Sequence, residues 1–192
     1  MIDTKYPIYL ASKSPRRKIL LKQIGLDFKT FSVELNEEIL DGEHPIKTVK
    51  RLSLEKLKIA EERISNGIVI TADTIVVIDK EIIGKPRTKS EAKKILKKLS
   101  GKTHFVYTGY SIKNSSNNKL ITEYSRTSVT FRKLSISEID NYIKSGSPMD
   151  KAGAYGIQDD YGAVFISKIR GCYYNVVGLP LSKVYMSLLE II

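Results

Sequence analysis

The segment "GIVITADTIVVID", residues 67–79, decides the fold class of this chain. Its apolar residues follow one another too continuously for a strand with one solvated face, so the pattern predicts a strand buried on both faces. Strands of this kind belong to α/β proteins, in which helices cover both faces of the sheet. Asp73 lies in the middle of the segment, where a carboxylate is costly unless it is paired, hydrogen-bonded or bound to a metal. It serves either a functional site at a strand end or a structural purpose, such as capping a turn or pairing a buried arginine.

Outside this strand, apolar patterns of the strand and helix types alternate along the chain. Strands are expected at 7–11, 28–33, 68–78, 103–113, 118–131 and 163–168, and helices at 15–24, 47–65, 89–99, 136–144 and 179–190. The turn cluster "KNSSNNK", residues 113–119, predicts that the two strands around it form a hairpin. This order predicts an α/β fold with a mixed sheet, and 192 residues suffice for one large domain or for two lobes that share a sheet.

Cysteine content and hydrophobicity point to a cytoplasmic protein. The single cysteine, Cys172, excludes an internal disulfide and favours a reducing compartment. No apolar run approaches the roughly 20 residues that a membrane-spanning helix needs, and the first residues do not match a secretion signal. We therefore expect a cytoplasmic location and no membrane partner.

The strongly basic composition favours an anionic partner. The formal net charge of +11, from 32 Lys and Arg against 21 Asp and Glu, is typical of proteins that bind nucleotides, nucleic acids or membrane surfaces. Much of the excess lies in the helix expected at 89–99, whose lysines fit an ordinary solvated face. With no Trp and 8% aromatic residues, the chain has few side chains to stack on bases, so a nucleic acid is the less favoured partner.

The segment "SKSPRRK", residues 12–18, predicts a helix start that also binds an anion. Ser14 is a suitable N-cap, and Pro15 suits the first helical position because its missing N–H costs nothing there. Arg16 and Arg17 then fall in the first turn, where the helix dipole disfavours cations by several tenths of a kcal/mol. An anion bound at this helix end would explain why the chain tolerates them.

Two lysines, Lys56 and Lys85, are candidates for a binding site. Lys56 falls in the middle of the apolar arc of the helix expected at 47–65, so it either extends outward to solvent or points into a site. Taken alone, the outward orientation is favoured. Lys85 in "IIGKPRT" follows a glycine and precedes a proline, which fixes an extended backbone, although an ordinary turn lysine fits the pattern as well.

Two further segments carry candidate binding residues. Lys151 and Gln158 lie in "MDKAGAYGIQ", residues 149–158, whose glycines suit either a backbone that approaches a ligand closely or a surface loop with positive φ. Glu37 lies on an acidic loop after the second strand. Taken together, the cations could neutralise a polyphosphate, and Asp73 and Glu37 provide the hard oxygen ligands that suit Mg²⁺.

Several well-known site motifs are absent. The "GKT" of residues 101–103 lacks the earlier glycine of a phosphate-binding P-loop, because position 96 is Leu. No GxGxxG follows a strand, and neither histidine lies in a zinc-binding spacing. A serine-hydrolase triad is disfavoured in a chain with only 2 histidines.

Seven segments in order make the chain resemble the Maf family of nucleoside triphosphate pyrophosphatases, once described as septum-formation inhibitors. They are "LASKSPRRKILL", "EKLKIA", "TADTIVV", "IGKPRT", "LSGKTHFVYTGYSI", "DKAGAYGIQ" and "NVVGLPL". The resemblance spans nearly the whole chain. It implies a single domain over residues 1–192 with a fold like that of inosine-triphosphate pyrophosphatases: an elongated mixed sheet flanked by helices, with two lobes around a central cleft.

The resemblance also implies a site and a reaction. It places the family's motifs on Ser14 and Arg17, with Ser12 and Arg16 beside them, and on Glu37, Lys56, Asp73, Lys85 and Gln158, with Lys151 nearby. Asp73, Glu37, Lys56 and Lys85 are then expected to be catalytic. Asp73 and Glu37 would hold Mg²⁺ or Mn²⁺, with Glu38 as an alternative to Glu37. Water would attack the α-phosphorus, and the products would be a nucleoside monophosphate and pyrophosphate.

The base specificity expected from the resemblance is for pyrimidines. Arg16, Thr74 and Gln158 are similar to the branch of the family that acts on dTTP, UTP and modified pyrimidine nucleotides. The alternatives are 7-methyl-GTP or another purine triphosphate, or a basic nucleic-acid-binding regulatory protein without this activity. Asp159 and Asp160 depart from the family pattern and could alter base choice or bind a metal. The resemblance further implies a homodimer and a connection to cell-division arrest.

Overall fold

The structure, a computed structural model, describes residue 2, residues 4–158 and residues 160–192, without the side chain of residue 160. Within these residues, seven strands form one mixed sheet in the order β2-β1-β3-β5-β6-β7, with β4 paired to β3. The expected α/β fold with a mixed sheet flanked by helices is thereby confirmed. The chain divides into two compact units, Met1–Asp73 with Thr108–Ser125 and Gly178–Ile192, and Thr74–Tyr107 with Arg126–Val177.

Three long strands contribute residues to both units: β3 (Ile68–Ile78), β5 (Thr103–Asn114) and β6 (Leu120–Phe131). The first unit also contains β1 (Ile8–Ala11), α1 (Pro15–Gln23), β2 (Lys29–Phe31), α2 (Pro45–Glu61) and α7 (Leu181–Ile191). The second contains β4 (Glu81–Ile83), α3 (Lys89–Leu99), α4 (Ile136–Lys144), the 3₁₀ turns η1 (Ser147–Asp150) and η2 (Ala152–Ala154), α5 (Asp160–Ala163), β7 (Ile166–Arg170) and α6 (Tyr173–Val177).

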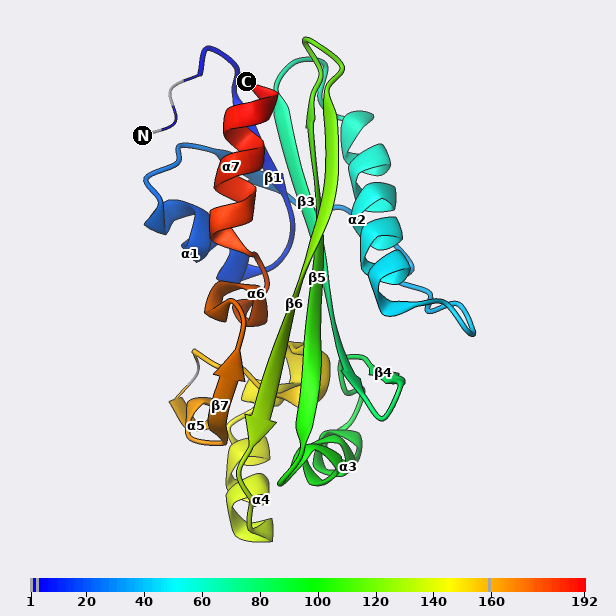
Figure 1. Ribbon diagram of the computed structural model, residues 1–192, viewed down its shortest axis with the longest axis vertical. Coiled ribbons are helices and arrows are strands. Elements are labelled where there is room, and N and C mark those ends of the chain that lie inside the picture. The colour runs from blue at the N-terminus through cyan, green and yellow to red at the C-terminus, as the bar shows by residue number, and fades with distance from the viewer. Residues whose placement is uncertain (1, 3, 159) are drawn as a thin grey trace. The chain divides into compact units, whose positions relative to one another are not determined.

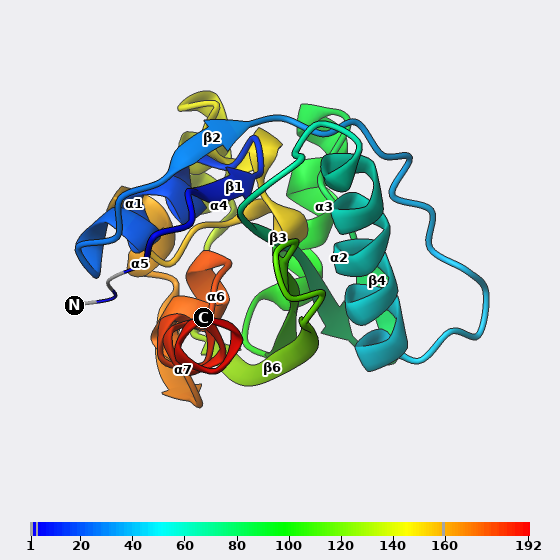
Figure 2. The same ribbon diagram turned by 90° about the horizontal axis from the view of Figure 1, so that it is seen from above.

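In the first unit, helices cover both faces of the sheet. β1 pairs in parallel with both β2 and β3. In Figures 1 and 2, α2 lies on one side of β3, while α1 and α7 lie on the other. The α2 side is filled by a cluster that includes Leu57, Ala60 and Val69. All of β3 except Thr74 is buried, so the strand predicted from residues 68–78 to be buried on both faces is confirmed.

The position of α2 depends on a glycine in β5. A Cβ atom added to Gly109 would lie 2.2 Å from the carbonyl oxygen of Val49 on α2, well inside van der Waals contact. Only a residue without a side chain therefore allows α2 to approach the sheet this closely. This packing fixes the height of α2 above β3, and with it the position of every side chain that α2 directs at the strand.

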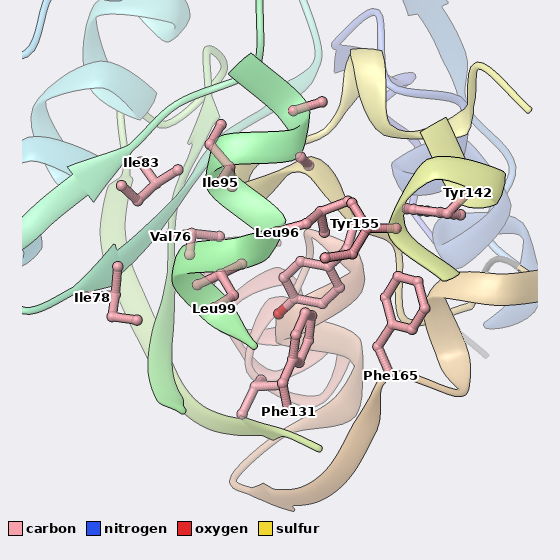
Figure 3. Close-up of a cluster of buried hydrophobic side chains, with 14 of the residues drawn as sticks. Val76, Ile78, Ile83, Ile95, Leu96, Leu99, Phe131, Tyr142, Tyr155 and Phe165 are labelled. Atoms are coloured by element: carbon pink, nitrogen blue, oxygen red, sulfur yellow. The ribbon is translucent and has the colours of Figure 1, made fainter. Parts of the chain in front are cut away.

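In the second unit, α3, α4 and the 3₁₀ turns enclose one hydrophobic core (Figure 3). Its base is the second half of β3, where Val76 and Ile78 face Leu96 and Leu99 of α3. Aromatic rings fill the far end, with Phe131 packed edge-on against Tyr155 and Phe165.

The short elements differ most from the sequence-based expectation. The hydrophobic pattern does not predict β4, η1, η2 or α6, and the strand expected at 163–168 is β7, Ile166–Arg170, because residues 160–163 form α5 instead. These segments are three to five residues long, too short to show a hydrophobic period. In the described part of the chain, no helix combines the length and apolar character needed to cross a bilayer.

Candidate functional site

Asp73 lies on β3 with its side chain facing α2, and only 5% of the residue is exposed. Its Oδ1 accepts a hydrogen bond from Lys56 Nζ at 2.5 Å. The direction follows from strand alternation, because Val69, four residues earlier on the same face, packs with Leu57 and Ala60 of α2. The Asp73 carboxylate, whose burial would be costly without a partner, is therefore paired with the Lys56 ammonium group and does not cap a turn.

Lys56 is the centre of the site in the first unit. It lies on the buried face of α2, is 8% exposed, and contacts Glu37 Oε1 at 2.6 Å in addition to Asp73. The outward orientation that the helix pattern alone favours is therefore wrong. A buried ammonium group loses the stabilisation that water gives to its charge. Here the carboxylates of Asp73 and Glu37 replace that stabilisation.

Glu37 reaches Lys56 from the irregular segment between β2 and α2. Its neighbour Glu38 presents a backbone carbonyl to α2, where Arg51 Nη2 donates to that oxygen at 3.0 Å. Of the two adjacent acids that the sequence leaves open, Glu37 is the one whose carboxylate lies beside Asp73 and Lys56.

Arg17 adds a second buried cation to this region of the first unit. Its Nε donates to the carbonyl oxygen of Gly178 at 2.8 Å, and its Nη1 donates to Ser12 Oγ at 3.3 Å. Burial lowers the pKa of Arg17, and the nearby carboxylates of Asp73 and Glu37 oppose that shift. Arg17, Lys56, Asp73 and Glu37 thus form one electrostatic group with two charges of each sign.

The predicted helix start is observed as expected from the sequence. Ser14 is the N-cap of α1 and accepts a hydrogen bond from the Arg17 backbone N–H, while Pro15 occupies the first turn. Arg16, one residue before the buried Arg17, is partly exposed, and its charge lowers the pKa of Arg17. The buried arginine is held by a carbonyl oxygen and by the field of two carboxylates, which explains how this helix end accommodates it.

The other candidate residues belong to the second unit. Thr74 is the one partly exposed residue of β3, and Lys85 and Gln158 are exposed. Lys151 is 8% exposed, and its Nζ donates to the Ser147 carbonyl oxygen at 2.5 Å. Asp159 and the side chain of Asp160 lie outside the described residues. As site residues, these candidates remain predictions.

Two of these segments are joined within the second unit. The N–H of Gly153 donates to the carbonyl oxygen of Gly84 at 3.1 Å, which links the residue before Lys85 to the segment that carries Lys151. Gly153 has φ of +73°, and a Cβ atom there would lie 2.8 Å from Val76 Cγ2. The glycine-rich segment therefore needs its glycine for backbone conformation and for close packing on β3.

The donor set fits a divalent metal that is shared with a substrate. Among the described residues, no group of three or more His, Cys, Asp and Glu side chains gathers that could hold an ion without help. Mg²⁺, however, commonly takes only one or two carboxylates, with substrate phosphates and water as its remaining ligands. Asp73 and Glu37 already converge on one cationic atom, Lys56 Nζ, so the two carboxylates fit such an ion.

Arg51 is the residue at this site that sequence reasoning misses. Its guanidinium binds both oxygens of Glu43 and the Glu38 carbonyl, and so connects α2 to the segment that carries Glu37. The only local signal is Glu55, four residues later on α2, and such a pair looks like an ordinary surface ion pair.

Comparisons with known proteins give matches over almost the whole chain. Residues 7–191 match the family model described as Maf-like protein. A protein named dTTP/UTP pyrophosphatase from Dictyoglomus thermophilum is 48% identical over 181 residues, which are 93% of each chain. Proteins with the same name from Chlorobium phaeovibrioides (46% identical, 95% of each chain) and Bacillus anthracis (48%, covering 94% of this chain and 93% of the relative) are similarly close. On the match over almost its full length, this chain belongs to the Maf family.

Proposed function

We propose that this protein hydrolyses dTTP and UTP, and modified pyrimidine nucleotides, to the nucleoside monophosphate and pyrophosphate. The observation that carries the proposal is the ion-pair group in which buried Lys56 bridges buried Asp73 and partly exposed Glu37, with Arg17 in their field. A group of this kind can bind phosphates and hold a water molecule beside them. The substrate is proposed from relatives of 46–48% identity that are named dTTP/UTP pyrophosphatase.

Phosphate binding is assigned to the cations and to the start of α1. Ser12, Ser14, Arg16 and Arg17 lie at or beside a helix N-terminus, where backbone N–H groups and the helix dipole favour anions. Lys56 and Lys85 would offset charge that develops on the phosphates and on the leaving pyrophosphate. Thr74, Lys151 and Gln158 are proposed to contact the remainder of the nucleotide.

The proposed chemistry is attack of water on the α-phosphorus. Asp73 is the base that orients or deprotonates this water, because it is a buried carboxylate whose position Lys56 fixes. Glu37 and Asp73 would hold Mg²⁺ or Mn²⁺, which when bound supplies positive charge to the phosphate oxygens. Lys56 keeps the two carboxylates from repelling each other.

Four further expectations belong to the same proposal. We propose that residues 1–192 act as a single Maf-like domain, that the protein is cytoplasmic, that it forms a homodimer, and that its activity affects septum formation. The first of these is supported by the family match, which runs from residue 7 to residue 191.

A panel of nucleotides tests the proposal. Canonical and modified triphosphates are incubated with the protein and Mg²⁺ or Mn²⁺, and pyrophosphate and orthophosphate are scored separately. We expect pyrophosphate as the first product, with dTTP and UTP as the best substrates. Orthophosphate as the first product would overturn α–β cleavage, and preference for 7-methyl-GTP or another purine nucleotide would overturn the pyrimidine assignment.

A further inference from the structure

Glu37 lies on a segment that has little regular structure to hold it. Residues 32–44, between β2 and α2, contain no helix or strand in the described chain. The Glu37 side chain is 40% exposed, whereas its partner Lys56 is buried. An ion pair at a partly exposed position contributes about 1 kcal/mol or less, so other contacts of the segment matter for where the carboxylate lies.

Arg51 on α2 attaches the segment of Glu37 to the helix. Its Nε and Nη2 donate to the two carboxylate oxygens of Glu43 at 2.9 and 2.7 Å, the paired geometry that makes such bonds strong. Nη2 also donates to the carbonyl oxygen of Glu38 at 3.0 Å. Nη1 faces Glu55 of the same helix at 3.3 Å, which orients the guanidinium.

The contact between Arg51 and Glu43 is a strong electrostatic one. Hydrogen bonding from Arg51 lowers the pKa of Glu43, and hydrogen bonding to Glu43 raises the pKa of Arg51. Both side chains are largely covered, 24% exposed for Arg51 and 13% for Glu43, so solvent screens the pair less than an ordinary surface pair.

The bond from Arg51 to the Glu38 carbonyl oxygen also restricts the position of the neighbouring residue, Glu37. Adjacent Cα atoms are about 3.8 Å apart, so fixing the carbonyl of Glu38 limits where the Glu37 side chain can go. Arg51 and Lys56 both project from α2, and they contact residues 38 and 37 respectively. The helix therefore holds the segment at two consecutive residues, once by the backbone and once by the carboxylate.

We propose that Arg51 is a positioning residue that holds Glu37 against Lys56 and Asp73. Its effect on turnover rests on the proposed function, whereas its effect on the segment does not. Residues that orient a ligand or catalytic group in this way typically change metal affinity or activity by about 10- to 100-fold when they are removed.

Hydrogen exchange tests the structural half without substrate. In Arg51→Met, amides of residues 34–43 should exchange faster than in the unaltered protein, and those in the middle of α2 should not. Glu43→Gln should behave like Arg51→Met, because an amide cannot accept both bonds. The matched control is Arg63→Met, which removes another arginine-to-carbonyl contact, the 3.0 Å bond to Ser32 at the beginning of the same segment. Unchanged exchange in Arg51→Met, or equal acceleration of 34–43 in Arg63→Met, overturns the inference.

A double-mutant cycle tests the catalytic half. We expect Arg51→Met to lower kcat about tenfold or more and to raise the Mg²⁺ concentration needed for half-maximal rate, with Arg51→Lys recovering part of the loss. In a Glu37→Gln background, Arg51→Met should add little, because the group that Arg51 positions is already gone. Fully additive losses, or full activity in Arg51→Met despite faster exchange, overturn the positioning role. Absence of pyrophosphatase activity in the unaltered protein would instead refute the proposed function, and exchange would still decide whether Arg51 holds the segment.

Discussion

At the scale of single residues, the site depends on positive side chains that compensate the charge of two carboxylates. Two carboxylates, Asp73 and Glu37, share one ammonium group, and Arg17 balances the remaining negative charge. Removing one member of a buried ion pair leaves an uncompensated charge, at a typical cost of about 3–5 kcal/mol. The residues therefore act on one another strongly, and a substitution that keeps the shape but changes the charge is the most informative.

Asp73→Asn is such a substitution. It keeps the volume of the side chain and one oxygen that can accept from Lys56, so the fold should persist. It removes the base, so we expect turnover to fall by about 100-fold or more. Pyrophosphate release measures the rate, and circular dichroism measures the fold. Near-normal release by a folded variant would exclude Asp73 as the base.

Lys56→Ala examines the cation between the two carboxylates. Without the ammonium group the carboxylates repel each other, and the phosphates lose a positive partner, so KM for the nucleotide should rise and kcat should fall. Initial rates over a range of nucleotide concentrations separate the two effects. Unchanged kinetic constants would show that Lys56 serves the stability of the first unit alone.

At the scale of elements, function depends on how closely α2 packs against the sheet. The helix carries Lys56, which reaches Asp73 on β3, and α2 lies against β5 at Gly109. The helix supplies a rigid row of positions, and the strand supplies Asp73. A change at their contact should therefore disturb stability and the site together.

Gly109→Ala tests this contact. The new methyl group would lie 2.2 Å from the Val49 carbonyl oxygen, so α2 has to move, at a cost of about 1–3 kcal/mol. We expect a lower Tm and reduced turnover. Gly84→Ala is the control for stability, because a Cβ atom there meets nothing within 4 Å and its Tm should change little. Equal melting temperatures for both variants would contradict the packing argument.

At the scale of the whole molecule, stability should depend on a buried histidine. His104 is fully buried in the core of the second unit, and its Nε2 lies 2.7 Å from Tyr155 Oη. Burial lowers the pKa of His104 from 6.5 to about 4. An unfolded chain therefore binds a proton near pH 6.5 that the folded chain binds only near pH 4, so the free energy of unfolding falls as the pH is lowered through this window.

The pH dependence can be measured against a matched variant. Urea unfolding between pH 6.5 and 4 should show an extra loss of up to about 3 kcal/mol in the unaltered protein relative to His104→Phe. Tyr155→Phe removes the hydrogen-bond partner but keeps the buried imidazole, so it should retain the dependence even though its stability is lower. Identical slopes for the unaltered protein and His104→Phe would exclude His104 as the cause.

The amino-acid sequence alone indicates several local features of the site. The cap at Ser14, the limits of β3 and the buried position of Asp73 follow from residue types and hydrophobic period, which act over a few neighbouring residues. The choice between Glu37 and Glu38 does not follow from the sequence, because both lie on a segment without a period. The inward orientation of Lys56 does not follow either, since it depends on acids 17 and 19 residues away.

Residue types and hydrophobic patterns are sufficient to predict the α/β class, the long helices and strands, and the side chains available for binding phosphate. The folded structure is needed to show that Lys56 is buried, that Arg17 binds the carbonyl oxygen of Gly178, 161 residues away, and that Arg51 binds the carbonyl oxygen of Glu38. The physical reason is the range of the forces involved. Hydrophobic period and capping are properties of neighbouring residues, whereas a buried charge is stable only where folding brings its opposite charges within a few ångströms.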